Sequence, residues 1–407
     1  MIKLHPHQKE AKAFLLSKRR AILADSMRLG KTLSTASAAT HNLPALILCP
    51  SSVKNHWAQE FKRVNPKLTI DIAHKGAHEF GLADVYIMNY ELLGKVEPAK
   101  HVTLILDEAH KIKNPQAKRT KASMKLIKKA TYAYALSGTP MPSRPVELWP
   151  LLYSMGITRF GWYDYTREFC NAWDAPWGRD VNGASNLKQL ARMMEPFVLR
   201  RTKEQVFPAY RPPEFSLITF DLPVDRKEAK FDKAALVEHD NPLLAFEGLA
   251  DIMLQSGLKK IPYGVEFIED LLSTEQQVVV FGHHKAVIDA LEEKLAEYKP
   301  LRLTGDTPSA KRGELVKQFK EDPSHRVFLG NVIAAGEGID LSTADTIVFM
   351  ESSWVPGVIQ QAAARTESMV KMNNAAQVYL LTTEASIDHY VLKRVLEKIE
   401  IIKEVLL

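Results

Sequence analysis

Short apolar segments alternate with helix-compatible segments along most of the chain, and this alternation limits the possible folds more than any other feature of the sequence. Each apolar segment ends at a polar residue or a turn signal. The pattern predicts parallel sheets of the α/β class, in which ligands collect at the carboxyl ends of the strands. In the first half of the chain, the predicted strands are Ala21–Ala24, Ala45–Cys49, Val85–Met88, Val102–Leu106 and Tyr132–Leu136.

The alternation is interrupted once and then resumes, which predicts more than one domain. A chain of 407 residues is also too long for a single core. We expect a first α/β lobe over 1–205 with a helical, aromatic appendage from about residue 149, a linker with a small helical element over 206–262, and a second α/β lobe over 263–407. The second lobe ends in an amphipathic helix, and its predicted strands are Gln277–Phe281, Leu301–Leu303, Val327–Gly330, Thr346–Met350 and Gln377–Leu381.

Composition narrows the functional classes only slightly. The chain has 54 Lys and Arg against 48 Asp and Glu, and a net charge of +6 is compatible with a polyanionic partner without requiring one. Two cysteines, Cys49 and Cys170, form neither a disulfide framework nor a metal cluster, which predicts a reducing compartment. No apolar run has the length of a membrane span, so we expect a cytoplasmic or nucleoid-associated protein without a membrane partner.

The segment Asp25–Thr32, which reads DSMRLGKT, follows the first predicted strand and precedes a helix-compatible segment. Such a turn directs backbone N–H groups and the positive end of the helix dipole at one point, where a phosphate binds. Gly30 permits close approach of the backbone, Lys31 reaches the β- and γ-phosphates, and the Thr32 hydroxyl binds Mg²⁺. The match is incomplete because Asp25 replaces the first glycine and Arg28 lies inside the loop. An ordinary strand–turn–helix junction is the alternative interpretation.

Two further junctions carry chemical groups at strand ends. Asp107 and Glu108 begin the sequence DEAH, and a buried acidic pair is costly unless it binds a cation or transfers a proton. We expect Asp107 to hold Mg²⁺ and Glu108 to orient and deprotonate the attacking water. A helix N-cap with an acidic first turn is the alternative. At the third junction, the hydroxyl groups of Ser137-Gly138-Thr139 are expected to hydrogen-bond the acidic motif, although the segment also fits a simple turn.

Taken in order, these motifs resemble the superfamily 2 helicases, specifically the Swi/Snf-type DNA translocases and their annealing-helicase (HARP-like) subgroup. The resemblance extends over nearly the whole chain, from about His5 to the final helix. The segments that carry it are GKT, LILCPSSVKNHW, DEAHKIKN, LSGTPMPSRPVELWPLL, REFCNAWDAPWGRDVNGASNLKQL, FVLRRTKEQV, VVVFGHHKAVIDAL, LRLTGDTPSAKRGELVKQF, AAGEGIDLSTADTIVF and WVPGVIQQAAAR.

The resemblance implies two RecA-like lobes with a nucleotide cleft between them, ATP and Mg²⁺ as cofactors, and DNA as a sequence-nonspecific partner, duplex or forked. It implies a DNA-dependent ATPase in which Lys31, Glu108 and Arg365 are catalytic. The implied nucleotide-binding residues are Gln8, which reads the adenine edge, Asp25, Gly30, Lys31, Thr32, Gly336, Gly338 and Arg365, with Thr32 and Asp107 at the metal. The implied DNA contacts are Ser51, Ser52, Lys54, Asn89, Tyr90, His283, His284, Lys285, Thr304, Gly305 and Asn331.

The last motif departs from the family, because Gln361 begins QAAARTESMVK where the family reads approximately QAxDRxHRxGQ. Arg365 matches the first arginine, but Ser368 replaces the second, and an arginine at such a position is worth about 10³–10⁵ in rate. Three interpretations remain. Arg365 acts alone with slow turnover, another cation such as Arg28 or Lys371 substitutes, or the protein is a nucleotide-gated DNA clamp with little hydrolysis.

Overall fold

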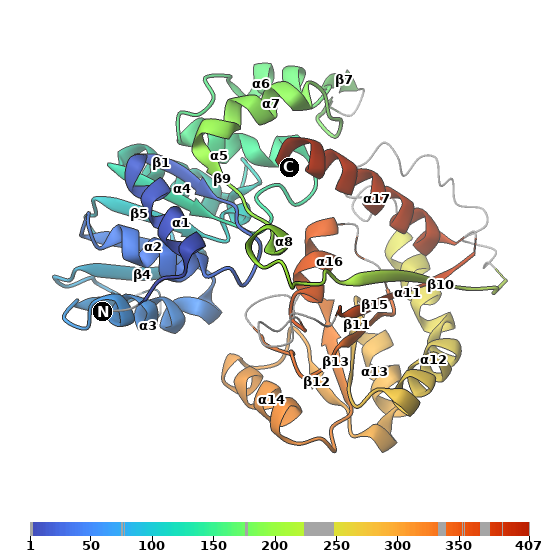
Figure 1. Cartoon of the computed structure of the whole chain (residues 1–407). Coiled ribbons are helices and arrows are strands. Elements are labelled where there is room, and N and C mark those ends of the chain that lie inside the picture. The colour runs from blue at the N-terminus through green and yellow to red at the C-terminus, as the bar shows by residue number, and fades with distance from the viewer. Residues whose placement is uncertain are drawn as a thin grey trace. The chain divides into compact units, whose positions relative to one another are not determined.

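The chain folds into two α/β units, which are shown in the computed structural model of Figure 1. The structure describes residues 3–74, 76, 78–175, 178–223, 248–332, 339–351, 353, 355–366, 375–384 and 386–406. Unit 1 comprises Met1–Val206 with Glu400–Leu407, and unit 2 comprises Phe207–Ile399.

Unit 1 contains a 7-stranded sheet of order β3-β4-β2-β5-β6-β1-β9, in which every pairing is parallel. Parallel pairing brings the carboxyl ends of β5, β6 and β1 to one edge, side by side, so the residues that follow these strands become neighbours. The strands are β1 Arg20–Leu23, β2 Ala45–Cys49, β3 Ile70–Ile72, β4 Val85–Asn89, β5 Thr103–Asp107, β6 Tyr132–Leu136 and β9 Val198–Leu199; a separate hairpin joins β7 Trp173–Ala175 to β8 Gly178–Asp180.

Helices cover both faces of the unit 1 sheet, as expected for strands that are apolar on both sides. One core lies under α1, α2 and α3, and the other lies under α4 to α7 together with the end of α17. Both cysteines are buried in this unit, Cys49 at the end of β2 and Cys170 directly after α6. The helices are α1 Pro6–Ser17, α2 Lys31–Ala39, α3 Lys54–Val64, α4 Lys118–Lys129, α5 Trp149–Ser154, α6 Trp162–Phe169, α7 Leu187–Met194 and α8 Lys203–Val206.

Unit 2 contains a 6-stranded parallel sheet of order β10-β15-β14-β11-β13-β12. The ends of β14, β11 and β13 are adjacent here, as the ends of β5, β6 and β1 are in unit 1. The elements are β10 Glu214–Phe220, β11 Val278–Gly282, β12 Leu301–Leu303, β13 Val327–Asn331, β14 Thr346–Phe349, β15 Gln377–Thr383, α11 Leu249–Lys259, α12 Ile261–Thr274, α13 Lys285–Lys294, α14 Ser309–Glu321, α16 Pro356–Ala363 and α17 Ile387–Leu406.

A buried ion pair connects the helices of unit 2. Lys260, which is 0% exposed, lies 2.6 Å from Asp388 Oδ2 and donates a hydrogen bond to the carbonyl of Leu381. Ser256 also donates to Asp388. Because removing one partner of a buried pair strands the other charge, this contact fixes the start of α17 on α11 and α12.

The α/β class and all ten predicted strands are confirmed, with each end within two residues of its prediction. The sequence interpretation missed β3, β9 and β10, which are short or partly exposed and lie at or next to sheet edges. The region predicted as a linker with a small helical element contains β10, all of α11 and the first residues of α12, which are part of unit 2. Residues 224–247 of that region lie outside the described residues.

Candidate nucleotide and DNA site

The loop between β1 and α2 turns through two residues in the left-handed region of the backbone. Gly30 caps α2 with φ of 76°, and Arg28 has φ of 66°. Glycine adopts this conformation without strain, whereas a bulky side chain is uncommon there. The turn places Lys31 at the start of α2. The backbone N–H groups at the N-terminus of a helix are suited to binding an anion.

The Lys31 ammonium group lies inside this loop. Its Nζ donates to the carbonyl oxygens of Asp25 and Ser26 at 2.7 and 3.2 Å. Burial lowers the pKa of Lys31, and the negative charges of Glu108, Asp25 and Asp107 oppose that shift. A Cβ at Gly138 would lie 3.6 Å from the same Nζ, so the turn after β6 borders the lysine. The loop is therefore already folded around its cation.

Asp25 pairs with an arginine that follows β9. Its carboxylate, 2% exposed, pairs with Arg201 through Nε at 3.0 Å and Nη2 at 2.5 Å, and it accepts the Arg201 backbone N–H at 3.0 Å. Arg201 also donates to the carbonyl of His7 and the carboxylate of Glu10. This carboxylate therefore fixes the loop against the segment after β9, and contact of Asp25 with the nucleotide stays a prediction.

The start of α1 rests on the same loop. Gln8 is 7% exposed, and its side chain packs on Gly30 so closely that a Cβ there would overlap the amide nitrogen. Its Oε1 accepts the N–H of His5, and His7 Nε2 lies 3.0 Å from the Leu29 carbonyl oxygen. Gly30 is thus required by its conformation and by this contact. Adenine recognition by Gln8 stays a prediction.

The acidic pair lies at the end of β5. Trp57 Nε1 donates to Asp107 Oδ2 at 2.8 Å, and the Glu108 N–H donates to Asp107 Oδ1 at 3.1 Å. Burial and the neighbouring Glu108 carboxylate raise the pKa of Asp107 to about 6. Glu108 has φ of 51°, a conformation that costs energy outside glycine. A bound divalent cation would offset the carboxylate repulsion, so these residues fit Mg²⁺ chemically.

The strand ends are linked to one another. His110 Nδ1 lies 3.1 Å from Ser137 Oγ and 3.3 Å from Glu108 Oε2. Ser137 Oγ also accepts the N–H of Thr139. The expected hydrogen bond between the hydroxyl junction and the acidic motif is therefore present, and it runs through the histidine of DEAH.

The predicted DNA contacts of unit 1 divide into two groups. Ser51 and Ser52 are exposed after β2. Lys54 is 5% exposed and donates to the Ala73 carbonyl at 2.8 Å and to Asn89 at 3.3 Å. Tyr90 is 1% exposed and donates to the Asp107 carbonyl at 2.8 Å. Buried hydrogen bonds occupy polar atoms of Lys54, Asn89 and Tyr90, and contact of these three residues with DNA stays a prediction.

In unit 2, one carboxylate organises the corresponding edge. Glu351, 2% exposed, accepts the backbone N–H groups of His283 and His284 at 2.8 and 2.9 Å, and its Oε1 lies 2.5 Å from His284 Nδ1. Asn331 Nδ2 donates to the His283 carbonyl at 2.6 Å. These residues therefore form a structural cluster at the strand ends, and His284 in particular is held inward.

The other predicted residues of unit 2 differ in exposure. Lys285 is exposed and pairs with Asp306 at 2.8 Å, Gly305 is exposed, and Thr304 is 7% exposed. Arg365 follows α16 and its carbonyl accepts the Leu341 N–H. Gly336 and Gly338, as well as Ser368 and Lys371, lie outside the described residues.

The sequence interpretation missed several residues beside the loop between β1 and α2. Arg200 Nη1 donates to the carbonyls of Ala24 and Gly138 at 3.2 and 3.4 Å. Lys203 is 6% exposed, and burial together with the charges of Arg28 and Lys31 lowers its pKa to about 7. The run RRTK, directly after a short apolar segment, is the sequence signal for these residues. The sequence alone does not show that this apolar segment pairs with β1.

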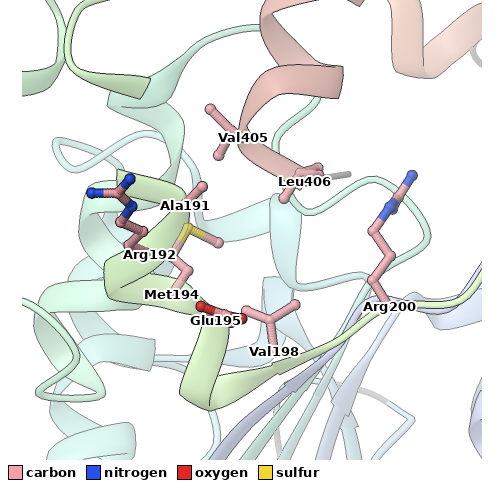
Figure 2. A pocket seen from close by; sticks show the side chains of 8 residues that line it. All are labelled: Ala191, Arg192, Met194, Glu195, Val198, Arg200, Val405 and Leu406. Carbon is pink, nitrogen blue, oxygen red and sulfur yellow. The ribbon is translucent and has the colours of Figure 1, made fainter. Parts of the chain in front are cut away.

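Arg200 also borders a pocket of about 290 Å³ within unit 1. Figure 2 shows Arg192 and Arg200 on opposite sides of it, with Val405 and Leu406 entering from the last turn of α17. Its remaining lining residues are Ala191, Met194, Glu195 and Val198.

The described residues contain neither a membrane-spanning helix nor a clustered metal site. None of the helices described is long and apolar enough to cross a membrane. Likewise, the described residues contain no group of three or more His, Cys, Asp or Glu arranged to hold a metal ion. Mg²⁺ at Asp107 does not require such a group, because Mg²⁺ commonly takes one or two carboxylates together with phosphate and water oxygens.

Comparison with known proteins identifies two family regions. Residues 7–252 match the SNF2-related domain, and residues 263–369 match the helicase conserved C-terminal domain. Among solved structures, the SWI2/SNF2 ATPase core of Sulfolobus solfataricus in complex with dsDNA is similar, with 22% identity, a TM-score of 0.47, and coverage of 99% of this chain and 94% of that chain.

Curated relatives are similar over nearly all of this chain. The Xenopus laevis "SWI/SNF-related matrix-associated actin-dependent regulator of chromatin subfamily A-like protein 1" is 32% identical, over 98% of this chain and 44% of the relative. The Mus musculus "DNA annealing helicase and endonuclease ZRANB3" is 30% identical, over 93% of this chain and 38% of the relative. The chain thus spans less than half the length of these two relatives.

Proposed function

The chain belongs to the SNF2-related family, as its resemblance to Swi/Snf-type translocases predicted, and from this membership we propose that it is an ATP-dependent DNA translocase or remodeller. ATP binding and hydrolysis take place at the nucleotide edge of unit 1, and DNA is bound through its phosphate backbone. Because phosphate contacts carry no sequence information, binding is nonspecific in sequence.

The observation that most strongly supports this proposal is the convergence of three strand ends on Lys31. The sheet order β5-β6-β1 makes them neighbours, and the carboxylates of Glu108 and Asp107 act electrostatically on the buried ammonium group. A cation between carboxylates and a helix N-terminus is an arrangement suited to nucleoside triphosphate phosphates.

The roles of these residues follow from their positions. Lys31 leaves the loop carbonyls and donates to the β- and γ-phosphates, while the loop N–H groups bind the same oxygens. Thr32 and Asp107 would hold Mg²⁺, which when bound neutralises charge on the phosphates. Glu108 orients the attacking water and accepts its proton, and the link from His110 to Ser137 keeps that carboxylate in place.

The exposed residues of the predicted DNA set are the ones we retain as contacts. Ser51 and Ser52 in unit 1, and Lys285 and Gly305 in unit 2, offer hydroxyl, ammonium and backbone donors to phosphate oxygens. Binding through such contacts weakens as salt increases, because each neutralised phosphate releases counterions.

A steady-state ATPase assay with and without duplex DNA tests the proposal. We expect DNA to stimulate turnover, and we expect Lys31→Ala and Glu108→Gln to lower the stimulated rate by roughly 10²-fold or more, since each removes a group that acts on the transferring phosphate or the water. Lys67→Ala, at an exposed lysine between α3 and β3, is the matched control and should retain the parental rate. Parental turnover in Lys31→Ala would refute the site.

The second candidate is a nucleotide-gated DNA clamp, and the substitution of Ser368 for the expected arginine favours it. A neutral hydroxyl does not stabilise charge on the transferring phosphate. The same assay separates the candidates, because the clamp binds ATP and DNA without stimulated turnover.

A further inference from the structure

Two consecutive arginines, Arg200 and Arg201, follow β9 and make different contacts. The pairing of β9 with β1 continues past the strand, since the Ser26 N–H donates to the Arg201 carbonyl at 2.9 Å. Successive side chains of an extended segment point to opposite sides. Arg201 accordingly reaches Asp25, whereas Arg200 reaches the turn after β6.

The Arg200 guanidinium group joins two adjacent strand ends. Its Nη1 donates to the carbonyl oxygen of Ala24, directly after β1, at 3.2 Å, and to that of Gly138, in the turn after β6, at 3.4 Å. Because β1 and β6 are paired in parallel, both carbonyl groups lie at the same edge of the sheet. One side chain therefore connects the start of the loop between β1 and α2 with the turn after β6.

The turn after β6 packs closely on the loop that contains Lys31. A Cβ at Gly138 would lie 3.0 Å from Met27 Cγ and 3.6 Å from Lys31 Nζ. Gly138 thus lies against the loop while Arg200 holds its carbonyl oxygen. Loss of the guanidinium group would free this peptide to shift beside Lys31.

The same turn reaches the acidic motif through a histidine. The Oγ of Ser137, which precedes Gly138, lies 3.1 Å from His110 Nδ1 and accepts the Thr139 N–H at 3.1 Å. His110 Nδ1 lies 3.3 Å from Glu108 Oε2. A shift of the turn therefore displaces the partner of His110, and with it the group beside the Glu108 carboxylate.

Two roles suit a cation at this place, which are contact with a phosphate and support of the turn. Burial lowers the pKa of Arg200, and the charge of Asp25 opposes that shift. Asp25, however, forms its ion pair with Arg201. The contacts of Arg200 are two backbone carbonyls, which are polar groups of the protein that need donors, so the structure favours support of the turn.

We propose that Arg200 is a positioning residue of the ATPase site, which holds the turn after β6 and thereby orients Glu108 toward the attacking water. The inference rests on the proposed function, because that function makes Glu108 the general base. Arg200 acts on the chemical step through Ser137 and His110, without contacting the nucleotide.

The test compares two variants that remove one arginine each. Arg200→Met deletes the donors and keeps an unbranched side chain. Arg192→Met is the matched control, because Arg192 is exposed and lies on the opposite side of the same pocket (Figure 2). The ATPase kcat and the KM for ATP are measured at saturating duplex DNA, and a fluorescent ATP analogue gives the dissociation constant. Circular dichroism confirms folding, and Arg200→Gln, which keeps one donor group, replaces the methionine variant if that variant does not fold.

For Arg200→Met, we expect kcat to fall roughly tenfold, while the KM and the dissociation constant stay within about twofold of the parent, since misplacement of a base affects chemistry more than binding. Arg192→Met should match the parent. Ser137→Ala should also lower kcat, and combining it with Arg200→Met should lower kcat by at most about a further twofold, because residues that act through one link are not additive.

Hydrogen exchange reads the same link without turnover. In the nucleotide-free protein, the Thr139 N–H donates to Ser137 Oγ. Arg200→Met should make exchange at Thr139 roughly threefold faster or more, because a turn that is held less firmly opens more often. Arg192→Met should leave this rate unchanged. Mass spectrometry of the peptide that contains Thr139 measures the difference.

Four results would overturn the inference. They are parental kinetics in Arg200→Met, a raised KM with an unchanged kcat, fully additive losses with Ser137→Ala, and parental exchange at Thr139. The raised KM would make Arg200 a nucleotide ligand instead. If the parent itself shows no DNA-stimulated turnover, the proposed function fails, and the exchange rate at Thr139 still decides whether Arg200 holds the turn.

Discussion

The carboxyl edges of the two sheets both hold polar groups close together, but they do so through different interactions. In unit 1, opposite charges interact: Arg201 forms an ion pair with Asp25, and the charges of nearby carboxylates act on the Lys31 ammonium group. In unit 2, a single carboxylate, Glu351, accepts hydrogen bonds from two consecutive backbone N–H groups, and charged side chains such as Lys285 stay exposed. The edge of unit 1 thus joins several opposite charges, whereas that of unit 2 is organised by one carboxylate and leaves other charged groups exposed.

Breaking the charge pair of unit 1 should have the largest effect. Arg201→Ala leaves the Asp25 carboxylate buried without its partner, and we expect the free energy of unfolding to fall by about 3–5 kcal/mol. Urea denaturation measures this change. Arg167→Ala removes an exposed pair with Asp164 and should cost about 0–1 kcal/mol. Equal losses in the two variants would show that the loop does not depend on the Asp25–Arg201 pair.

Removing the hub of unit 2 should have the next largest effect. Glu351→Ala abolishes hydrogen bonds from His283 and His284, and we expect a loss of about 2–4 kcal/mol. Asp306→Ala, at an exposed pair, is the control and should cost at most about 1 kcal/mol.

The same variant should change the acid limb of the stability curve. Burial acts to raise the pKa of Glu351, but hydrogen bonds from His284 and His283 lower it below 4.5 overall. A lowered pKa contributes stability above pH 4.5 that is lost as the pH falls through the folded-state value. Glu351→Ala should therefore flatten that limb, and an unchanged limb would contradict the assignment.

The sequence predicted which strand ends carry polar groups better than it predicted the contacts that those groups make. Apolar runs located the strands, and a strand end followed by GKT or DEAH located the chemistry, because both signals are local. The pairing of Asp25 with Arg201 spans 176 positions, so no local pattern reports it. Lys54 and Tyr90 were predicted to face DNA from their motif positions, but burial is a property of tertiary packing, and their polar atoms bond inside unit 1.

We expect an intermediate effect at Asp107, because the folded state disfavours ionisation of its carboxyl group. Folding raises the pKa of Asp107 from 3.8 to about 6. The free energy of unfolding therefore falls as the pH rises through that interval, because the folded state disfavours the ionised carboxylate. Asp107→Asn should increase the free energy of unfolding at pH 7.5 by about 1–3 kcal/mol and leave it nearly unchanged at about pH 3. Denaturation at both pH values measures this difference, and a gain that is equal at both would contradict the explanation. The variant should lack ATPase activity.

The smallest effect is expected at Trp57, which orients Asp107 from α3. Trp57→Phe keeps most of the buried ring and removes the N–H donor, so we expect a loss of about 1 kcal/mol in stability. The ATPase kcat should fall about three- to tenfold with little change in the KM for ATP, since a misplaced carboxylate affects chemistry more than binding. A change confined to KM would show that Trp57 acts on nucleotide binding instead.

The burial of both cysteines has a practical consequence for following the proposed ATPase cycle. Cys49 and Cys170 are inaccessible, and burial raises the pKa of the Cys49 thiol, which suppresses the reactive thiolate. A thiol-reactive dye should therefore not react with the two native cysteines. It should label only introduced cysteines, such as those of Lys67→Cys in unit 1 and Glu293→Cys in unit 2. Single-molecule energy transfer between two such dyes can then follow the distance between the units during turnover, with both native cysteines retained.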